Sequence, residues 1–284
     1  MNHQIARNRS LNKLPVKLLL LFLAVNFLSQ ALLARPSDSI SELNGKYFKK
    51  ILKDTGTILT SPGSWEKKDW FRFGLSLAAT SAFFPLDNSI HRQVYENESP
   101  TLTSVSRAFS FAGAPVSLLG MLSAGYLIGH FKHSDSVRAT FLLAGESLLI
   151  TELFVQAGKI GIGRARPYTL EGPFVFNPIT LQGQWQSFPS GHSAAAWAVA
   201  TSLASRVKSP YLRATFFAIA SGISLSRIFL DKHFASDVVG SALLGYFIAR
   251  KLSKPESPEK KANGAALSFN LGHRFVAFGL SYQF

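Results

Sequence analysis

The sequence predicts an all-α protein, a bundle of six helices that is embedded in a membrane or associated with one. Hydrophobic residues make up 47% of the 284 residues and charged residues only 16%, whereas a soluble domain usually has roughly 25% charged residues. Such a length allows one ordinary domain, which we place at residues 69–252. Six apolar stretches in this region are long enough for helices and are separated by Gly, Pro or charged clusters: 70–86, 104–130, 138–158, 192–207, 211–229 and 236–252.

Charge and cysteine content narrow the possible functions. The chain has no cysteine, which excludes disulfides, thiolate metal sites and a cysteine nucleophile. Its formal net charge of +14 fits an anionic partner, such as phosphate esters or acidic lipid headgroups. Nucleic acid is disfavoured as a partner, because the basic residues are dispersed and form no recognisable nucleic-acid module. Alternatively, many of these charges flank membrane segments and set their orientation.

The N-terminal region is expected to direct export. Four basic residues precede an apolar run at 18–28, and small residues follow it before Arg35 and Pro36. This layout is typical of a secretory signal peptide at residues 1–34, although an uncleaved N-terminal anchor would look similar. Residues 35–68 are polar and mixed, and we expect a short leader segment with a weak helix at most.

The number of membrane spans is less clear from the sequence. Only the segment 108–129 has the length and composition of an unambiguous span, because several other stretches are shorter or contain charged residues. Basic residues cluster at alternate turns, which by the positive-inside tendency places the loops holding 159–191 and 227–237 on the periplasmic or outer side. A cleaved signal peptide followed by six spans would instead put these loops inside, so the topology stays open.

The C-terminal end differs from the helical domain in its composition and in its pattern of apolar residues. Residues 253–264 form a linker containing Pro, Glu and Lys, and apolar residues alternate on both sides of Gly272 over residues 265–284. This alternation predicts a short β-hairpin, which we interpret as an appendage facing the envelope. A disordered tail is the alternative.

Three short segments concentrate residues that suit phosphate chemistry. In the first, Lys159 and Arg166 lie seven residues apart on a Gly-rich backbone that can bend around an anion, and Pro167 follows. A lysine and an arginine at a membrane border are ordinary, so this segment alone is weak support for a site.

The second segment is Phe188-Pro-Ser190-Gly191-His192, which leads into an Ala-rich stretch. Ser190 and Gly191 at the opening of a helix would offer free backbone N–H groups and the positive end of the helix dipole to a phosphate. His192 could then serve as a proton donor. A plain helix cap with an incidental histidine remains the alternative.

The third segment contains Arg227, His233 and Asp237. His233 and Asp237 are four residues apart and would share one face of a helix. A carboxylate that bonds one imidazole nitrogen fixes the tautomer and leaves the other nitrogen as a nucleophile. A structural cap or ion pair is the alternative role for Asp237.

Together the segments supply cations, backbone donors, two histidines and one orienting carboxylate. They contain no cluster of Asp and Glu that would hold Mg²⁺ or Zn²⁺, so we expect phosphoryl transfer without a metal or cofactor. The transition state spreads negative charge over the equatorial oxygens, which Lys159, Arg166 and Arg227 can neutralise together with the groups of Ser190 and Gly191.

The three segments resemble the motifs of the type 2 phosphatidic acid phosphatase (PAP2) superfamily, which also includes the vanadium haloperoxidases. Its pattern is K-x6-RP, then PSGH, then SR-x5-H-x3-D, and residues 159–167, 189–192 and 226–237 match it at every fixed position. The resemblance implies a helical bundle in which His233 attacks phosphorus, Asp237 orients it and His192 protonates the leaving oxygen. Water would then hydrolyse the phosphohistidine.

The resemblance leaves the substrate open. Similar family members act on phosphatidate, undecaprenyl pyrophosphate, lipid A or phosphatidylglycerol phosphate, and exported soluble relatives act on small phosphate esters. The apolar bundle and the leader favour a lipid phosphatase of a bacterial-type envelope, with its active site facing the periplasm. A soluble periplasmic acid phosphatase of broad specificity, a vanadium haloperoxidase and an inactive lipid-binding scaffold are the alternatives.

Overall fold

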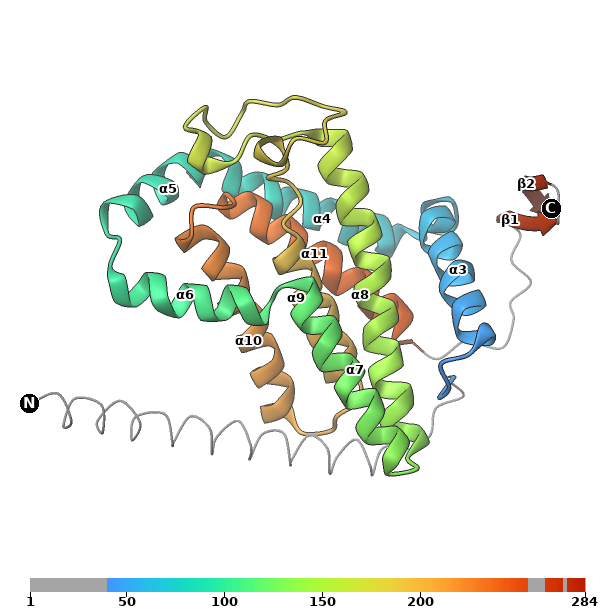
Figure 1. The fold of residues 1–284 in the computed structure, drawn as a ribbon. Helices are drawn as coiled ribbons and strands as arrows, with labels where there is room; N and C mark the ends of the chain where they lie inside the picture. Colours follow the sequence, from blue (N-terminus) through green and yellow to red (C-terminus); the bar gives the residue numbers. More distant parts are fainter. Residues whose placement is uncertain (1–39, 255–263, 273–274, 284) are drawn as a thin grey trace, which may run out of the picture.

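The computed structural model describes residues 40–254 and the backbone of 264–272 and 275–283 (Figure 1). The expected signal peptide or anchor at 1–34 therefore lies outside the described residues, as do most residues of the expected linker. The α-helices are α3 (Gly45–Thr60), α4 (Lys67–Phe83), α5 (Asp87–Glu96), α6 (Pro100–Ala112), α7 (Pro115–Phe131), α8 (Asp135–Ile162), α9 (Gly191–Ser205), α10 (Pro210–Phe229) and α11 (Ala235–Leu252).

Helix α9 is the centre of the bundle and packs against α7, α8, α10 and α11. Its many small residues, among them Ala194, Ala195 and Ala198, are buried, so neighbouring helix backbones can approach it closely. On α11, a Cβ atom at Gly245 would lie 2.1 Å from the carbonyl oxygen of Ala194, a distance that only glycine permits. This close packing sets the position of α11 relative to α9.

The predicted all-helical domain is confirmed, but the expected number of six helices is wrong. Residues 67–252 form eight helices, α4 to α11. The stretch predicted at 104–130 is broken near Gly113, because Pro115 starts a new helix there. The polar helix α5 follows a 3₁₀ turn at Phe84–Leu86 and lacks the apolar run that identified the other helices.

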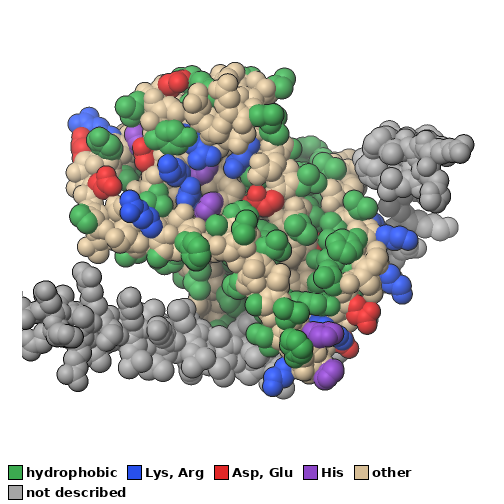
Figure 2. Space-filling view, viewed as in Figure 1, with side chains coloured by type: hydrophobic (Ala, Val, Ile, Leu, Met, Phe, Trp, Pro, Cys, Tyr) green, Lys and Arg blue, Asp and Glu red, His purple; other side chains and the backbone are tan. Residues whose placement is uncertain are grey.

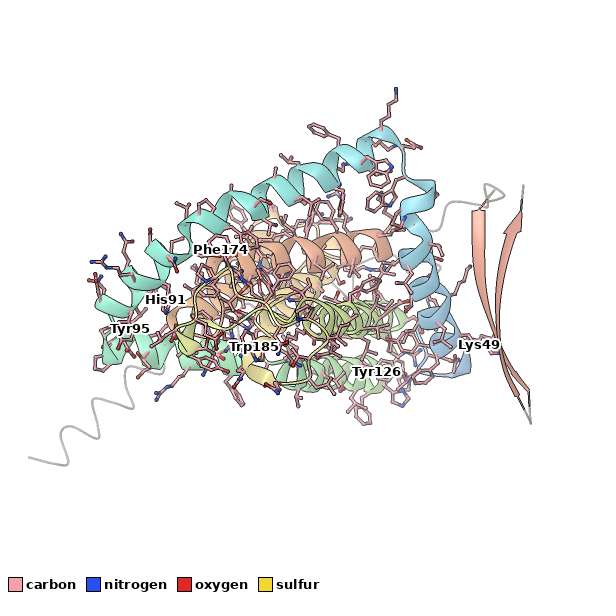
Figure 3. The ribbon with its side chains drawn as sticks, turned by 90° about the horizontal axis from the view of Figure 1, so that it is seen from above. Lys49, His91, Tyr95, Tyr126, Phe174 and Trp185 are labelled. Atoms are coloured by element: carbon pink, nitrogen blue, oxygen red, sulfur yellow. The ribbon has the colours of Figure 1, made fainter. Side chains whose placement is uncertain are left out.

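The expectation of a weak helix at most within 35–68 is also wrong. The 16-residue helix α3 occupies this region, and the side chain of Asn44 caps its N-terminus by accepting from the backbone N–H groups of Lys46 and Tyr47. Tertiary contacts hold α3 against α8: the Tyr47 hydroxyl donates to the carbonyl oxygen of Leu142 at 2.9 Å, and Lys50 pairs with Glu146 at 2.9 Å. Figure 3 shows α3, with Lys49, at the side of the bundle away from His91 and Tyr95 of α5.

Two helices within the described residues are long and apolar enough to cross a membrane, α8 and α10. The segment 108–129, expected to be an unambiguous span, is instead divided between α6 and α7, which meet at an angle of 54°. The two helices reach the length and hydropathy of a span only as a bent pair. A break at Gly113 and Pro115 is invisible to a count of apolar residues, which is why composition alone suggested a straight span.

Near the C-terminus, strands β1 (Gly264–Gly272) and β2 (Phe275–Gln283) pair antiparallel. Gly264 lies opposite Gln283, and Gly272 lies opposite Phe275. The connecting residues 273–274 lie outside the described part of the chain, so the hairpin as a whole stays a prediction.

Candidate active site

The end of α8 and the turn after it position the first pair of cations. Lys159 lies in the last turn of α8, and the residue that caps the helix end is Gly163, whose φ is +61°. A Cβ atom on Gly163 would lie 1.8 Å from the carbonyl oxygen of Asn177, so both the left-handed backbone and the close approach require glycine. Beyond this turn, the backbone N–H of Arg166 donates to the carbonyl oxygen of Gln184 at 2.9 Å, which fixes Arg166 beside the end of α8.

The second motif forms the N-terminus of α9, as predicted. Ser190 is the N-cap residue and Gly191 the first helical residue. The Ser190 N–H donates to the hydroxyl of Ser241 on α11 at 2.6 Å, while the buried Ser190 Oγ has no hydrogen-bond partner among the described residues. The first turn of a helix has unsatisfied N–H groups and a partial positive charge, an arrangement that attracts phosphate.

The third motif spans the end of α10 and the turn before α11. Arg227 lies in the last turn of α10, and its carbonyl oxygen accepts from the N–H groups of Lys232 and His233 at 3.0 and 3.3 Å. Since α11 begins only at Ala235, His233 does not share a helix face with Asp237 as expected. The histidine is instead held in a turn that folds back onto the end of α10.

His233 is oriented by a group that the sequence analysis did not identify. Its Nδ1 lies 2.6 Å from the carbonyl oxygen of Ser187, whereas the nearest oxygen of Asp237 is 3.9 Å away, too far for a hydrogen bond. A carbonyl oxygen can only accept, so Nδ1 must carry the proton and Nε2 is left with its lone pair. The expected direct bond from Asp237 to His233 is therefore wrong; the Ser187 hydroxyl connects the two by donating to Asp237.

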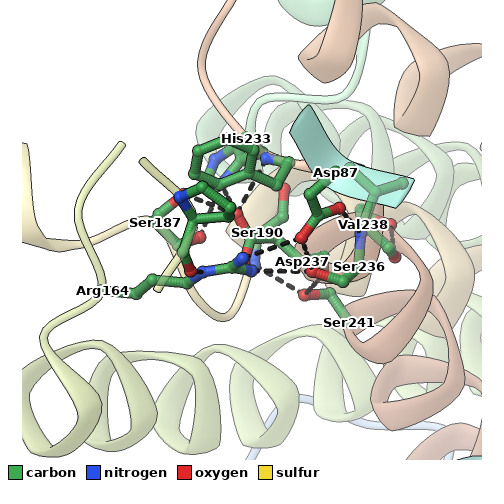
Figure 4. Close-up of polar contacts among 12 residues, drawn as sticks. Asp87, Arg164, Ser187, Ser190, His233, Ser236, Asp237, Val238 and Ser241 are labelled. Atoms are coloured by element: carbon green, nitrogen blue, oxygen red, sulfur yellow. Dashed lines mark hydrogen bonds and ion pairs between the residues drawn. The ribbon is translucent and has the colours of Figure 1, made fainter. Parts of the chain in front are cut away.

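Asp237 belongs to a fully buried ionic network centred on Arg164 (Figure 4). The guanidinium of Arg164 bonds Asp237 at 2.5 Å through Nη1 and Asp87 of α5 at 2.8 Å through Nη2. Asp87 also accepts from the N–H and the hydroxyl of Ser236 at 2.9 and 2.5 Å. All three charged side chains are 0% exposed, so each depends on the others for compensation of its charge.

Sequence reasoning missed Asp87, Arg164, Ser187 and Ser236. Arg164 is one of the six variable residues between Lys159 and Arg166 in the first motif. Nothing in the sequence distinguished it from an exposed arginine. Asp87 is 77 residues away from Arg164, and no local pattern reports such a pairing. Asp87 could have been flagged only as an acidic residue directly after an apolar stretch.

Three cations surround both histidines. Burial, and then the charges of Arg227, Lys159 and Arg166, lower the pKa of His192 to about 3. Burial and the same three cations also hold the pKa of His233 well below its usual value. Both imidazoles are therefore neutral near pH 7 in the absence of a bound anion.

The predicted residues thus come together from three separate segments of the chain. In Figure 2, Lys, Arg and His side chains gather in a hollow below the loop of residues 163–190. His192 and Arg227 both reach Ser110 on α6, His192 through the Ser110 backbone and Arg227 through the Ser110 hydroxyl. Cations near the end of α8 and unsatisfied N–H groups at the start of α9 are groups that attract a small anion.

Comparison with known proteins agrees with the motifs. Residues 140–254 match the family model of the PAP2 superfamily, and this segment contains all three motifs. The matched segment, about two fifths of the chain, is thus similar to the PAP2 superfamily.

Curated proteins with a similar sequence include lipid A 1-phosphatases. The enzyme of Rhizobium etli is 34% identical over 36% of this chain and 44% of its own length. That of Porphyromonas gingivalis is 28% identical over 76% of this chain and 49% of its own length. The chain thus spans just under half the length of these relatives.

Two solved structures resemble the chain. A transmembrane PAP2 type phosphatidylglycerolphosphate phosphatase from Bacillus subtilis has a TM-score of 0.49 and 22% identity, covering 66% of this chain and 94% of its own. Aquifex aeolicus LpxE has a TM-score of 0.47 and 23% identity, covering 59% of this chain and 94% of its own.

Replacing Arg164 by methionine should be strongly destabilising. The change leaves Asp87 and Asp237 buried without their cation, and breaking a buried pair in this way typically costs about 3–5 kcal/mol. The matched change Arg92→Met, at an exposed position of α5, should alter stability by less than about 0.5 kcal/mol. Thermal unfolding of the detergent-solubilised variants measures both, and equal stability of the two would contradict the network's role.

The lowered pKa of His192 predicts a specific loss of stability in acid. Below about pH 6.5 the unfolded chain binds a proton at His192, whereas the folded protein does so only near pH 3. Stability is therefore present above pH 6.5 and falls as the pH decreases, by up to about 2 kcal/mol at pH 5 for this group.

Unfolding of wild type and His192→Gln at pH 7.5 and pH 5 tests this expectation. The variant should lose about 2 kcal/mol less than wild type over this interval, while His130→Gln, exposed at the end of α7, should behave as wild type. Equal losses in wild type and His192→Gln would show that His192 is not kept neutral.

Proposed function

We propose that the protein is a phosphohydrolase that releases phosphate from a lipid phosphate of the cell envelope through a phosphohistidine on His233. The observation that carries this proposal is the hydrogen bond of 2.6 Å between His233 Nδ1 and the carbonyl oxygen of Ser187. It leaves Nε2 unprotonated, and three cations lie around the ring. The match of residues 140–254 to the PAP2 superfamily model and the names of the curated lipid A 1-phosphatases support the same class of reaction.

In the proposed first step, the lone pair of His233 Nε2 attacks phosphorus while the bond to the leaving oxygen breaks. Lys159, Arg166 and Arg227 face the negative charge that spreads over the phosphoryl oxygens. Free N–H groups at the start of α9 add donors of fixed direction. We call these three cations and the N–H groups at the start of α9 the cradle. The cradle is formed before substrate arrives, so little reorganisation is needed during the reaction.

His192 is proposed to protonate the leaving oxygen and then to deprotonate the water that hydrolyses the phosphohistidine. In the free protein its pKa is lowered by burial and by the three nearby cations. A bound phosphoryl group brings negative charge that offsets these cations, which raises the affinity of His192 for a proton. Substrate binding therefore favours the protonated state that a general acid requires.

The loop of residues 163–190, next to the cradle, favours a lipid over a small soluble ester. Its exposed side chains include several large apolar ones: Leu170, Phe174, Ile179 and Leu181 are between 61% and 87% exposed. Neighbouring apolar side chains exposed in this way mark a surface that meets lipid or another apolar partner. Acyl chains leaving the cradle on this side would cover them.

Phosphate release by the full chain in detergent with EDTA tests the proposed function. The substrates are a lipid A preparation, phosphatidate, undecaprenyl pyrophosphate and p-nitrophenyl phosphate. We expect preferential turnover of a lipid, no effect of EDTA and a loss of at least about 10³-fold in kcat for His233→Ala. The exposed variant His130→Ala should keep wild-type turnover.

Undiminished turnover in His233→Ala would reject His233 as the nucleophile. Comparable kcat/KM values for the lipids and p-nitrophenyl phosphate would instead favour a broad-specificity phosphatase. Loss of activity with EDTA would reject the metal-independent reaction.

A further inference from the structure

An acidic side chain lies within the cationic cradle, and the proposed mechanism does not use it. Glu152 is on α8, two turns before Lys159. Its carboxylate oxygens lie 3.4 and 3.5 Å from the position of a Cβ atom on Gly191, and the Lys159 amino group lies 3.7 Å from the same point. Glu152 and Lys159 therefore meet at the glycine that begins α9 and offers its N–H to the phosphoryl group.

One oxygen of this carboxylate has an unused capacity to accept a hydrogen bond. Glu152 Oε1 is buried and has no hydrogen-bond partner among the described residues. The other oxygen, Oε2, is reached only by the amide of Gln156 at 3.5 Å, the limit for such a bond. An unsatisfied buried acceptor costs about 1–3 kcal/mol, so it needs a partner that arrives with the ligand.

We infer that Glu152 is a specificity-determining residue that accepts a hydrogen bond from a protonated oxygen of the bound phosphoryl group. The ligand class is a phosphate monoester or inorganic phosphate that shares one proton with the carboxylate. A tetrahedral anion of the same size without a proton, such as sulfate, meets an unpaired carboxylate and is repelled. The inference deepens the proposed function, because it concerns the same phosphate-binding site.

The chemistry of phosphate fits this arrangement. The second pKa of a phosphate monoester is about 6, so at pH 6.5 roughly a quarter of the free ligand carries a proton, and binding can select that form. Sulfate carries no proton at this pH. Sulfate carries two negative charges and a phosphate that keeps one proton carries only one, so the cations alone would not favour phosphate over sulfate. The Glu152 carboxylate can accept a hydrogen bond from a protonated phosphate. Sulfate has no proton to donate, so the buried carboxylate oxygen stays unpaired and sulfate binds more weakly.

The test compares the binding of inorganic phosphate and sodium sulfate to the full chain in detergent at pH 6.5 and constant ionic strength. Ligand-dependent thermal stabilisation gives both dissociation constants for each protein. We expect wild type to bind phosphate at least about tenfold more tightly than sulfate. In Glu152→Gln this ratio should fall to about threefold or less, because an amide can donate to either anion.

Two further variants serve as controls. Glu171→Gln removes the same charge at an exposed position of the loop after α8 and should keep the wild-type ratio. Glu152→Asp retains the carboxylate and should keep a preference for phosphate, although weaker because the side chain is shorter. Both constants come from one preparation, so their ratio does not depend on the fraction of protein that is folded.

An unchanged ratio in Glu152→Gln, or a wild-type ratio below about threefold, would overturn the inference. The proposed function fails by a different result, namely the absence of hydrolysis of every phosphate ester tested. Because the anion ratio is a binding measurement, it decides the role of Glu152 in either case.

Discussion

A buried guanidinium, Arg164, joins the two carboxylates on which this end of the bundle depends. Asp87 comes from α5 and Asp237 from the first turn of α11, and neither has any exposed side-chain surface. Charges removed from water in this way are tolerated only when they are paired and hydrogen-bonded. The pairing therefore brings three distant parts of the chain to one place.

The position of His233 follows from this network. Asp237 accepts a hydrogen bond from the hydroxyl of Ser187. The carbonyl oxygen of Ser187 in turn accepts one from the Nδ1–H of His233. From the other side, Asp87 holds the backbone of Ser236 three residues beyond the histidine. His91 of α5 adds a contact of 2.6 Å with Asp231, two residues before it. The turn that carries His233, the proposed nucleophile, is thus held in place on both sides of this residue.

The sequence predicted the helical domain and the ends of most of its helices, because apolar runs interrupted by Gly, Pro and charged residues report directly on local structure. It also identified the motif residues, since their spacing is fixed within each short segment. Helix α5 was missed because it lacks an apolar run, and α3 because tertiary contacts to α8 stabilise it. Asp87, Arg164 and Ser187 act through contacts between distant segments, which no local pattern reveals.

Three cations, Lys159, Arg166 and Arg227, surround two neutral histidines, an arrangement that favours an anion over an empty site. Glu152 adds a single negative charge next to Lys159. We infer that the balance between these groups, rather than the number of cations alone, decides which anion binds. In the proposed function, the exposed apolar side chains of the loop 163–190 favour a lipid attached to that anion.

The most direct test of the account is the identity of the phosphorylated atom. Rapid quenching of the full chain during turnover of a ³²P-labelled lipid phosphate, at alkaline pH to preserve phosphohistidine, allows the modified nitrogen to be identified by mass spectrometry and chromatography. The account predicts phosphate on Nε2 of His233, because Nδ1 is bound to Ser187. Phosphate on Nδ1, or turnover that passes through no phosphohistidine, would contradict it.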